Sequence, residues 1–120
     1  MSERALPYIV AVDFDGTLCE NAFPEIGAPK QEIIDTIKEY RSFGWKIILW
    51  TCRNKEHLTK AVEWCNQQGL VFDSINENLP EVEEVFGGYT RKIFADVYID
   101  DKNVLLKEVD RSGIRGINSK

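Results

Sequence analysis

The chain reads Tyr-Ile-Val-Ala-Val-Asp-Phe-Asp-Gly-Thr-Leu at residues 8–18, so an apolar run leads directly into two aspartates separated by one residue. The run predicts a buried strand, and because side chains alternate along a strand, Asp13 and Asp15 share one face. Two like charges this close indicate either that a divalent cation binds there or that one carboxyl group acts as an acid and the other as a base. The alternative is a loop of solvated aspartates that caps a helix. The carboxyl end of a strand, where α/β sheets bind ligands, favours a site.

Length, charge and cysteine usage limit the class of protein. The 120 residues predict one domain with one core. A formal net charge of -5 without a basic block argues against a free-standing nucleic-acid binder. No stretch resembles a signal peptide or a membrane span, and the three cysteines have no paired spacing, so a cytoplasmic protein without a zinc site is expected.

Hydrophobic periodicity predicts the remaining helices and strands. An amphipathic helix is expected over 29–43, with Pro29 in its first turn, and a second over 54–68, capped by Asn54. Further strands are expected over 46–50, 70–75 and 93–99, with a loop and one helical turn over 76–88. This order predicts a single-domain, Rossmann-like, three-layer α/β/α fold with a mostly parallel sheet. Trp50 and Trp64 are expected in the core, and Trp45 partly exposed.

Polar residues follow three of the predicted strands, and parallel strands bring their carboxyl ends to one edge. These residues are Asp13 and Asp15, then Thr51 and Arg53, then Asp100 and Asp101, with Lys92 just before the last strand. Carboxylates from two strands can hold Mg²⁺, a cation that prefers oxygen ligands. One aspartate can then attack phosphorus while the second transfers protons. The pattern therefore predicts magnesium-dependent phosphoryl chemistry.

These stretches resemble the four signature motifs of the haloacid dehalogenase (HAD) superfamily, in the order of that family. Residues 13–18 resemble the first motif, 47–51 the second, Lys92 the third and 97–101 the fourth. The resemblance spans roughly residues 9–103. Neither 18–29 nor 68–91 has room for a cap domain, so the resemblance implies a small capless phosphatase-type member whose single domain spans 1–120.

The resemblance also implies a role for each matching residue. Asp13 would be the nucleophile and a metal ligand, and Asp15 the general acid/base whose backbone carbonyl binds the metal. Thr51 would bind the transferring phosphoryl group. Lys92 would stabilise the aspartyl phosphate, with Arg91 as the alternative cation. Asp100 and Asp101 would complete the Mg²⁺ site, and Arg53 would clamp the substrate phosphate or face solvent.

The implied function is a phosphomonoester hydrolase acting on a small phosphorylated metabolite, such as a sugar phosphate or a nucleotide. Without a cap, specificity would be broad, or it would be supplied by residues 20–26, residues 76–89 and a second copy in a homo-oligomer. One alternative is a phosphatase acting on nucleic-acid ends, and another is a non-catalytic phosphate-binding or regulatory module of the same fold. A phosphorelay receiver domain is a third, although receivers place the acidic pair first and the phosphoacceptor in mid-chain.

Overall fold

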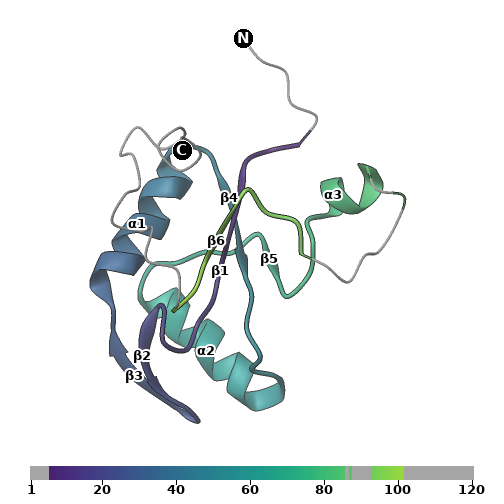
Figure 1. The fold of residues 1–120 in the computed structure, drawn as a ribbon. Helices are drawn as coiled ribbons and strands as arrows, with labels where there is room; N and C mark the ends of the chain where they lie inside the picture. Colours follow the sequence, from purple (N-terminus) through teal and green to yellow (C-terminus); the bar gives the residue numbers. More distant parts are fainter. Residues whose placement is uncertain (1–5, 86, 88–92, 102–120) are drawn as a thin grey trace.

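The fold is built on a four-stranded parallel sheet, seen in a computed structural model that describes residues 6–85, 87 and 93–101 (Figure 1). The strands are β1 (Ile9–Val12), β4 (Lys46–Leu49), β5 (Ser74–Ile75) and β6 (Val97–Ile99). They lie in the spatial order β5-β4-β1-β6, and every neighbouring pair is parallel. A separate antiparallel hairpin consists of β2 (Cys19–Ala22) and β3 (Glu25–Pro29).

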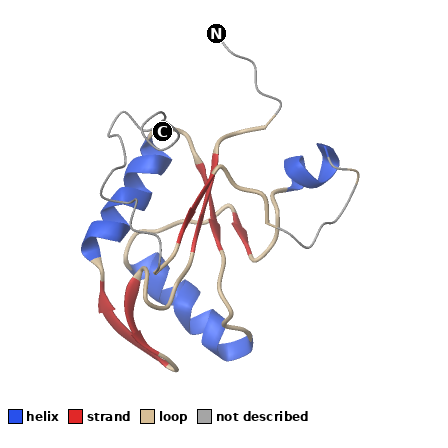
Figure 2. Ribbon diagram, in the orientation of Figure 1, coloured by secondary structure: helices blue, strands red, loops and turns tan. Residues whose placement is uncertain are grey.

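Helices cover both faces of the sheet (Figure 2). Helices α1 (Gln31–Ser42) and α2 (Lys55–Gln67) lie on one face and α3 (Pro80–Val85) on the other. Because side chains alternate along β1, Val10 and Val12 pack with α1 and α2, whereas Ile9 and Ala11 pack with α3. All four are fully buried, as expected for a parallel strand covered on both faces. The predicted Rossmann-like α/β fold with a mostly parallel sheet is therefore confirmed.

Several element boundaries differ from the sequence-based predictions. Pro29 is not in a helix but ends β3, paired with Cys19, and α1 starts two residues later. The predicted strand over 70–75 is reduced to Ser74–Ile75, because the N–H of Leu70 instead closes the end of α2 through the Cys65 carbonyl.

The last strand is also shorter than predicted and begins at Val97. Side chains accept hydrogen bonds from the backbone N–H groups that precede β6. The N–H of Phe94 donates to Asn78 Oδ1, and that of Ala95 donates to the Tyr98 hydroxyl. These N–H groups are therefore satisfied without strand pairing.

Two of the three tryptophan predictions are wrong. Trp45 is only 1% exposed, because it lies between the rings of Tyr8 and Tyr40, with centroid distances of 5.1 and 4.7 Å. Trp50 is 44% exposed, since it lies just beyond the end of β4, where its ring packs edge-on against Tyr98. Trp64 is half-buried and packs edge-on against Phe14.

In the described part of the chain, no helix has both the length and the apolar character needed to cross a bilayer.

Candidate active site

Aspartates from opposite ends of the chain meet at the carboxyl edge of the sheet. Asp13 directly follows β1, and its N–H donates to the Ile99 carbonyl at 3.0 Å. Val12 is in register with Ile99, so Asp100 and Asp101 leave β6 beside Asp13. A Cβ on Gly16 would lie 3.3 Å from the Cβ of Asp101. The structure thus brings the first and last acidic pairs together, as the strand order predicts.

The order in which the chain adds strands to the sheet reverses between β1 and β6, which makes this position the topological switch point of the sheet. From β1 the chain moves outward to β4 and β5 on one side, and it returns to β6 on the other side. Connections that diverge on either side of a central strand leave a crevice beyond the strand ends, where open α/β sheets bind ligands. Asp13 and Asp100 follow β1 and β6, the two neighbouring strands between which the strand order reverses.

The end of β4 places Thr51 at the same edge. The N–H of Trp50 donates to the Val12 carbonyl, which extends the pairing with β1 by one residue. Thr51 is buried, and its Oγ1 accepts a hydrogen bond from the Arg53 N–H at 3.1 Å. This contact leaves the hydroxyl hydrogen of Thr51 available for donation to an anion.

Asn76 holds the Thr51 backbone and is a site residue that the sequence analysis missed. Its Oδ1 accepts a hydrogen bond from the Thr51 N–H at 2.8 Å. Asn76 follows β5 directly and has a φ of 58°, a left-handed conformation that Asn tolerates better than most residues. An Asn directly after a strand of the same sheet was the available signal.

Asp13 lies in an environment that disfavours its charge. Partial burial raises the pKa of Asp13, and the charges of Asp101, Asp15 and Asp100 raise it further. A hydrogen bond from the Phe14 N–H to Asp13 Oδ1, at 2.7 Å, opposes this shift. A cation at this edge would relieve the repulsion among these carboxylates.

The donor chemistry fits a hard cation, although the carboxylates are not assembled around one. Among residues 6–85, 87 and 93–101, no group of three or more His, Cys, Asp or Glu side chains is arranged to hold a metal ion. The convergent groups nevertheless carry the oxygen ligands that Mg²⁺ prefers. Asp13, Asp100, Asp101 and the backbone carbonyl of Asp15 are the groups that would hold it.

Arg53 is buried and paired with Asp15. It is only 3% exposed, so the alternative of a solvent-facing Arg53 is wrong. Its Nε and Nη2 donate to the two carboxylate oxygens of Asp15, each at 2.8 Å. The remaining guanidinium hydrogens reach the backbone carbonyls of Pro24, Glu25 and His57. Since all five N–H donors have an acceptor, Arg53 could clamp a phosphate only by releasing one of them.

The predicted third motif cannot be placed, since Lys92 and its alternative Arg91 lie outside the described residues. A different cation reaches the first motif: Nζ of Lys30 donates to the Gly16 carbonyl at 3.1 Å. Lys30 precedes α1 and was not among the predicted site residues.

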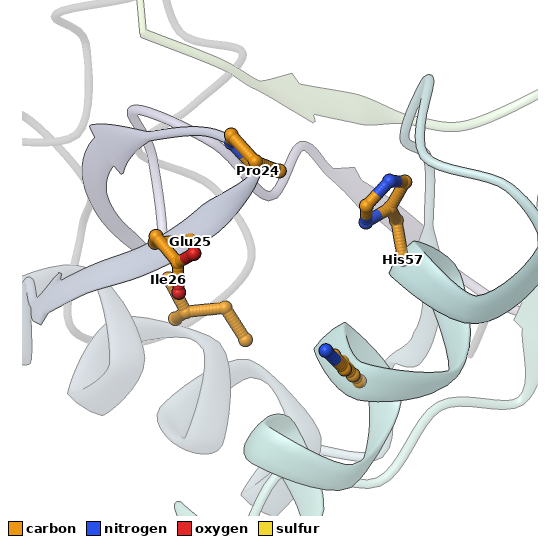
Figure 3. Close-up of a pocket in the computed structure, with 5 residues that line it drawn as sticks. Pro24, Glu25, Ile26 and His57 are labelled. Carbon is orange, nitrogen blue, oxygen red and sulfur yellow. The ribbon is translucent and has the colours of Figure 1, made fainter.

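A pocket of about 320 Å³ lies between the hairpin and α2 (Figure 3). It is lined by Pro24, Glu25 and Ile26 from the hairpin and by His57 and Lys60 from α2. Three of these residues are those whose carbonyls accept from Arg53, so the pocket adjoins the Arg53–Asp15 pair.

The fold and the acidic residues at the carboxyl edge of the sheet define the class of protein: a Rossmann-like α/β protein with acidic residues at the topological switch point. Neither a protein-family model nor a curated protein sequence matches the chain. It is similar to a solved structure of a conserved protein coded by a locus of Bacteroides thetaiotaomicron, with a TM-score of 0.73 and 34% identity over 96% of this chain and 100% of that one. This chain belongs to the same family as that conserved protein. The relationship names no activity.

The charge cluster at Asp13 leads to a stability prediction. Because the folded-state pKa of Asp13 is raised above 3.8, the folded protein binds more protons than the unfolded chain between pH 3.8 and that higher value. Stability therefore falls as the pH rises through this window, and the loss persists at higher pH. In the absence of metal at about pH 7, we expect Asp13→Asn to be more stable than the parent protein, because the amide carries no charge to be repelled by the neighbouring carboxylates.

Thermal unfolding in a chelating buffer measures this effect. The exposed carboxylate of Asp35, which pairs with Gln31 on α1, offers Asp35→Asn as a matched control with no comparable gain. A lower melting temperature for Asp13→Asn than for the parent protein at neutral pH would contradict the prediction.

Proposed function

We propose that this protein is a magnesium-dependent phosphomonoester hydrolase that works through an aspartyl phosphate on Asp13. The main support is the contact that brings the two ends of the chain together, the hydrogen bond from the Asp13 N–H to the Ile99 carbonyl. This contact supports the proposal because it brings Asp13, which follows β1, beside the acidic pair that follows β6. The motif resemblance to the HAD superfamily supports the same reaction.

In this proposal the reaction proceeds as two successive displacements at phosphorus. A carboxylate oxygen of Asp13 attacks phosphorus, the bond from phosphorus to the ester oxygen breaks, and Asp15 gives its proton to the departing alcohol. Water then attacks the same phosphorus while Asp15 takes the proton back, which releases phosphate and restores the Asp13 carboxylate. Thr51 donates its hydroxyl hydrogen to a phosphoryl oxygen. Bound Mg²⁺ would supply positive charge that offsets the negative charge of the phosphoryl group.

We further propose a small phosphorylated metabolite as the substrate, such as a sugar phosphate or a nucleotide. The formal net charge of -5 disfavours binding to a polyanion, which counts against the alternative of a nucleic-acid end. The pocket beside Arg53 is of a size that suits a small leaving group. The unpaired thiols of Cys19, Cys52 and Cys65 favour a cytoplasmic location.

A phosphate-release screen tests the proposal. The full chain is incubated with Mg²⁺ and a library of phosphate esters, beside Asp13→Asn and the control Asp35→Asn. Release by the parent and by Asp35→Asn, but not by Asp13→Asn, is the expected result. Oligonucleotides with terminal phosphates in the same screen test the alternative of a phosphatase that acts on nucleic-acid ends. Phosphate binding without release from any ester would favour the non-catalytic module.

The acidic pair after β6 leads to a prediction about metal binding. Replacing both Asp100 and Asp101 by Asn removes two of the negative charges that would hold Mg²⁺ and leaves neutral amide oxygens in their place. We expect the affinity for Mg²⁺ to fall by at least about 100-fold, measured by calorimetric titration of the metal alone. Equal Mg²⁺ affinity in the double variant and in Asp35→Asn would show that β6 contributes no ligand.

A further inference from the structure

We propose that Arg53 is a positioning residue that holds the carboxylate of Asp15 in the orientation needed to protonate the leaving group. This inference rests on the proposed function, because it assigns a structural cause to the acid/base role of Asp15. It differs from the predicted role of Arg53, which was a direct clamp on the substrate phosphate.

The first argument is the geometry of the pair. Nε of Arg53 donates to Asp15 Oδ2 and Nη2 donates to Oδ1, both at 2.8 Å, so the planar fork fixes both oxygens of the carboxylate. Each carboxylate oxygen keeps a second lone pair. Asp15 can therefore gain or lose a proton on the free side of an oxygen while Arg53 still holds it. The Asp15 side chain remains 21% exposed, which leaves it open toward a substrate.

The second argument is that Arg53 is itself fixed by its surroundings. Its other N–H groups donate to the carbonyls of Pro24 at 3.3 Å, Glu25 at 2.9 Å and His57 at 3.4 Å. The rings of Phe14 and Phe23 each lie 5.0 Å from the guanidinium carbon. An arginine held by five acceptors and two aromatic rings has little freedom to turn toward a substrate phosphate.

The third argument is connectivity. Arg53 links the hairpin, the start of α2 and Asp15, and its bonds to Pro24 and Glu25 reach the same residues that line the pocket in Figure 3. The hairpin therefore supports the acid/base residue through one buried side chain.

Leaving-group dependence separates positioning from phosphate binding. The value of kcat/KM reports the steps up to formation of the aspartyl phosphate, and only a poor leaving group needs a proton in those steps. We compare 4-nitrophenyl phosphate, which has a good leaving group, with an alkyl phosphate. Arg53→Gln should lower kcat/KM by about 100-fold or more for the alkyl ester and by less than about 10-fold for the nitrophenyl ester. Asp15→Asn should show the same contrast.

Arg53→Lys provides a second variant that keeps the positive charge. Lysine lacks the planar fork, so it should show the same contrast between esters with a smaller loss than Arg53→Gln. Circular dichroism establishes that each variant is folded. Equal losses on the two esters in the folded variants would overturn the inference, because a residue that binds the transferred phosphate affects both alike.

A readout independent of catalysis completes the test. The Arg53 Nε–H is buried against Asp15, so its NMR signal should exchange slowly with water in the parent and in Asp35→Asn, and rapidly in Asp15→Asn. Unchanged exchange in Asp15→Asn would overturn the pairing. If the parent hydrolyses neither ester, the proposed function fails and the proton-transfer role fails with it. Hydrolysis with equal losses leaves the function standing and removes only the role of Arg53.

Discussion

Asp13→Asn is expected to lower kcat with 4-nitrophenyl phosphate by at least about 10⁴-fold, since the amide cannot form the acyl phosphate through which both displacements proceed. The change is nearly isosteric, and the Asp13 N–H that donates to Ile99 is untouched. The fold should therefore persist. Initial rates with saturating Mg²⁺, measured for the parent, Asp13→Asn and Asp35→Asn, give the ratio directly.

The melting temperatures of the same three proteins show whether a loss of rate is caused by unfolding of the variant. We expect Asp13→Asn to be inactive and at least as stable as the parent in the absence of metal. A folded Asp13→Asn protein that turns over at the parental rate would remove Asp13 as the nucleophile.

Asp15→Asn is expected to lower the steady-state rate by about 10²- to 10⁴-fold, the range associated with a lost general acid/base. With 4-nitrophenyl phosphate the first displacement should still occur, because this leaving group departs without a proton. The second displacement should become slow, because no carboxylate remains to activate water. Rapid-quench measurements should therefore show a burst of nitrophenolate followed by slow turnover.

The size of the burst distinguishes this prediction from simple damage to the site. One nitrophenolate per protein molecule indicates that the aspartyl phosphate forms and persists. A slow rate with no burst would place the loss in the first displacement and would count against Asp15 as the base of the second.

The layout of the site could be predicted from the sequence because it follows from strand order. One apolar run forms β1 and leads into Asp13, another forms β6 and leads into Asp100, and parallel strands share one carboxyl edge. No side-chain detail is needed to bring these two residues together. For the same reason the layers of the fold were predictable, whereas the ends of α1, β5 and β6 were not.

The environment of Arg53 could not be predicted, because it depends on partners far away in the sequence. Its acceptors include Asp15, Pro24 and Glu25, which lie 28 to 38 residues earlier. Only the folded hairpin brings these carbonyls to the start of α2. The sequence presented an arginine after a strand end, a pattern shared by phosphate ligands and by solvent-facing residues.

The exposure of Trp45 and Trp50 was predicted incorrectly for a similar reason. Both flank the same apolar run, but the chain reverses at Gly44, which has a φ of 93°, and this turn places Trp45 beneath Tyr40. Trp50 extends past the last pair of the strand, so fewer neighbours cover it. Hydrophobicity alone does not distinguish the two positions.

Mass spectrometry of the acid-quenched protein tests the central claim most directly. The Asp15→Asn variant is mixed with 4-nitrophenyl phosphate and Mg²⁺, quenched in acid and digested, and the modified residue is located in the peptides. The account predicts one phosphoryl group on Asp13, which is absent when Asp13 is also replaced by Asn. Phosphate on any other residue, or hydrolysis by the parent with no trace of a covalent adduct in Asp15→Asn, would contradict it.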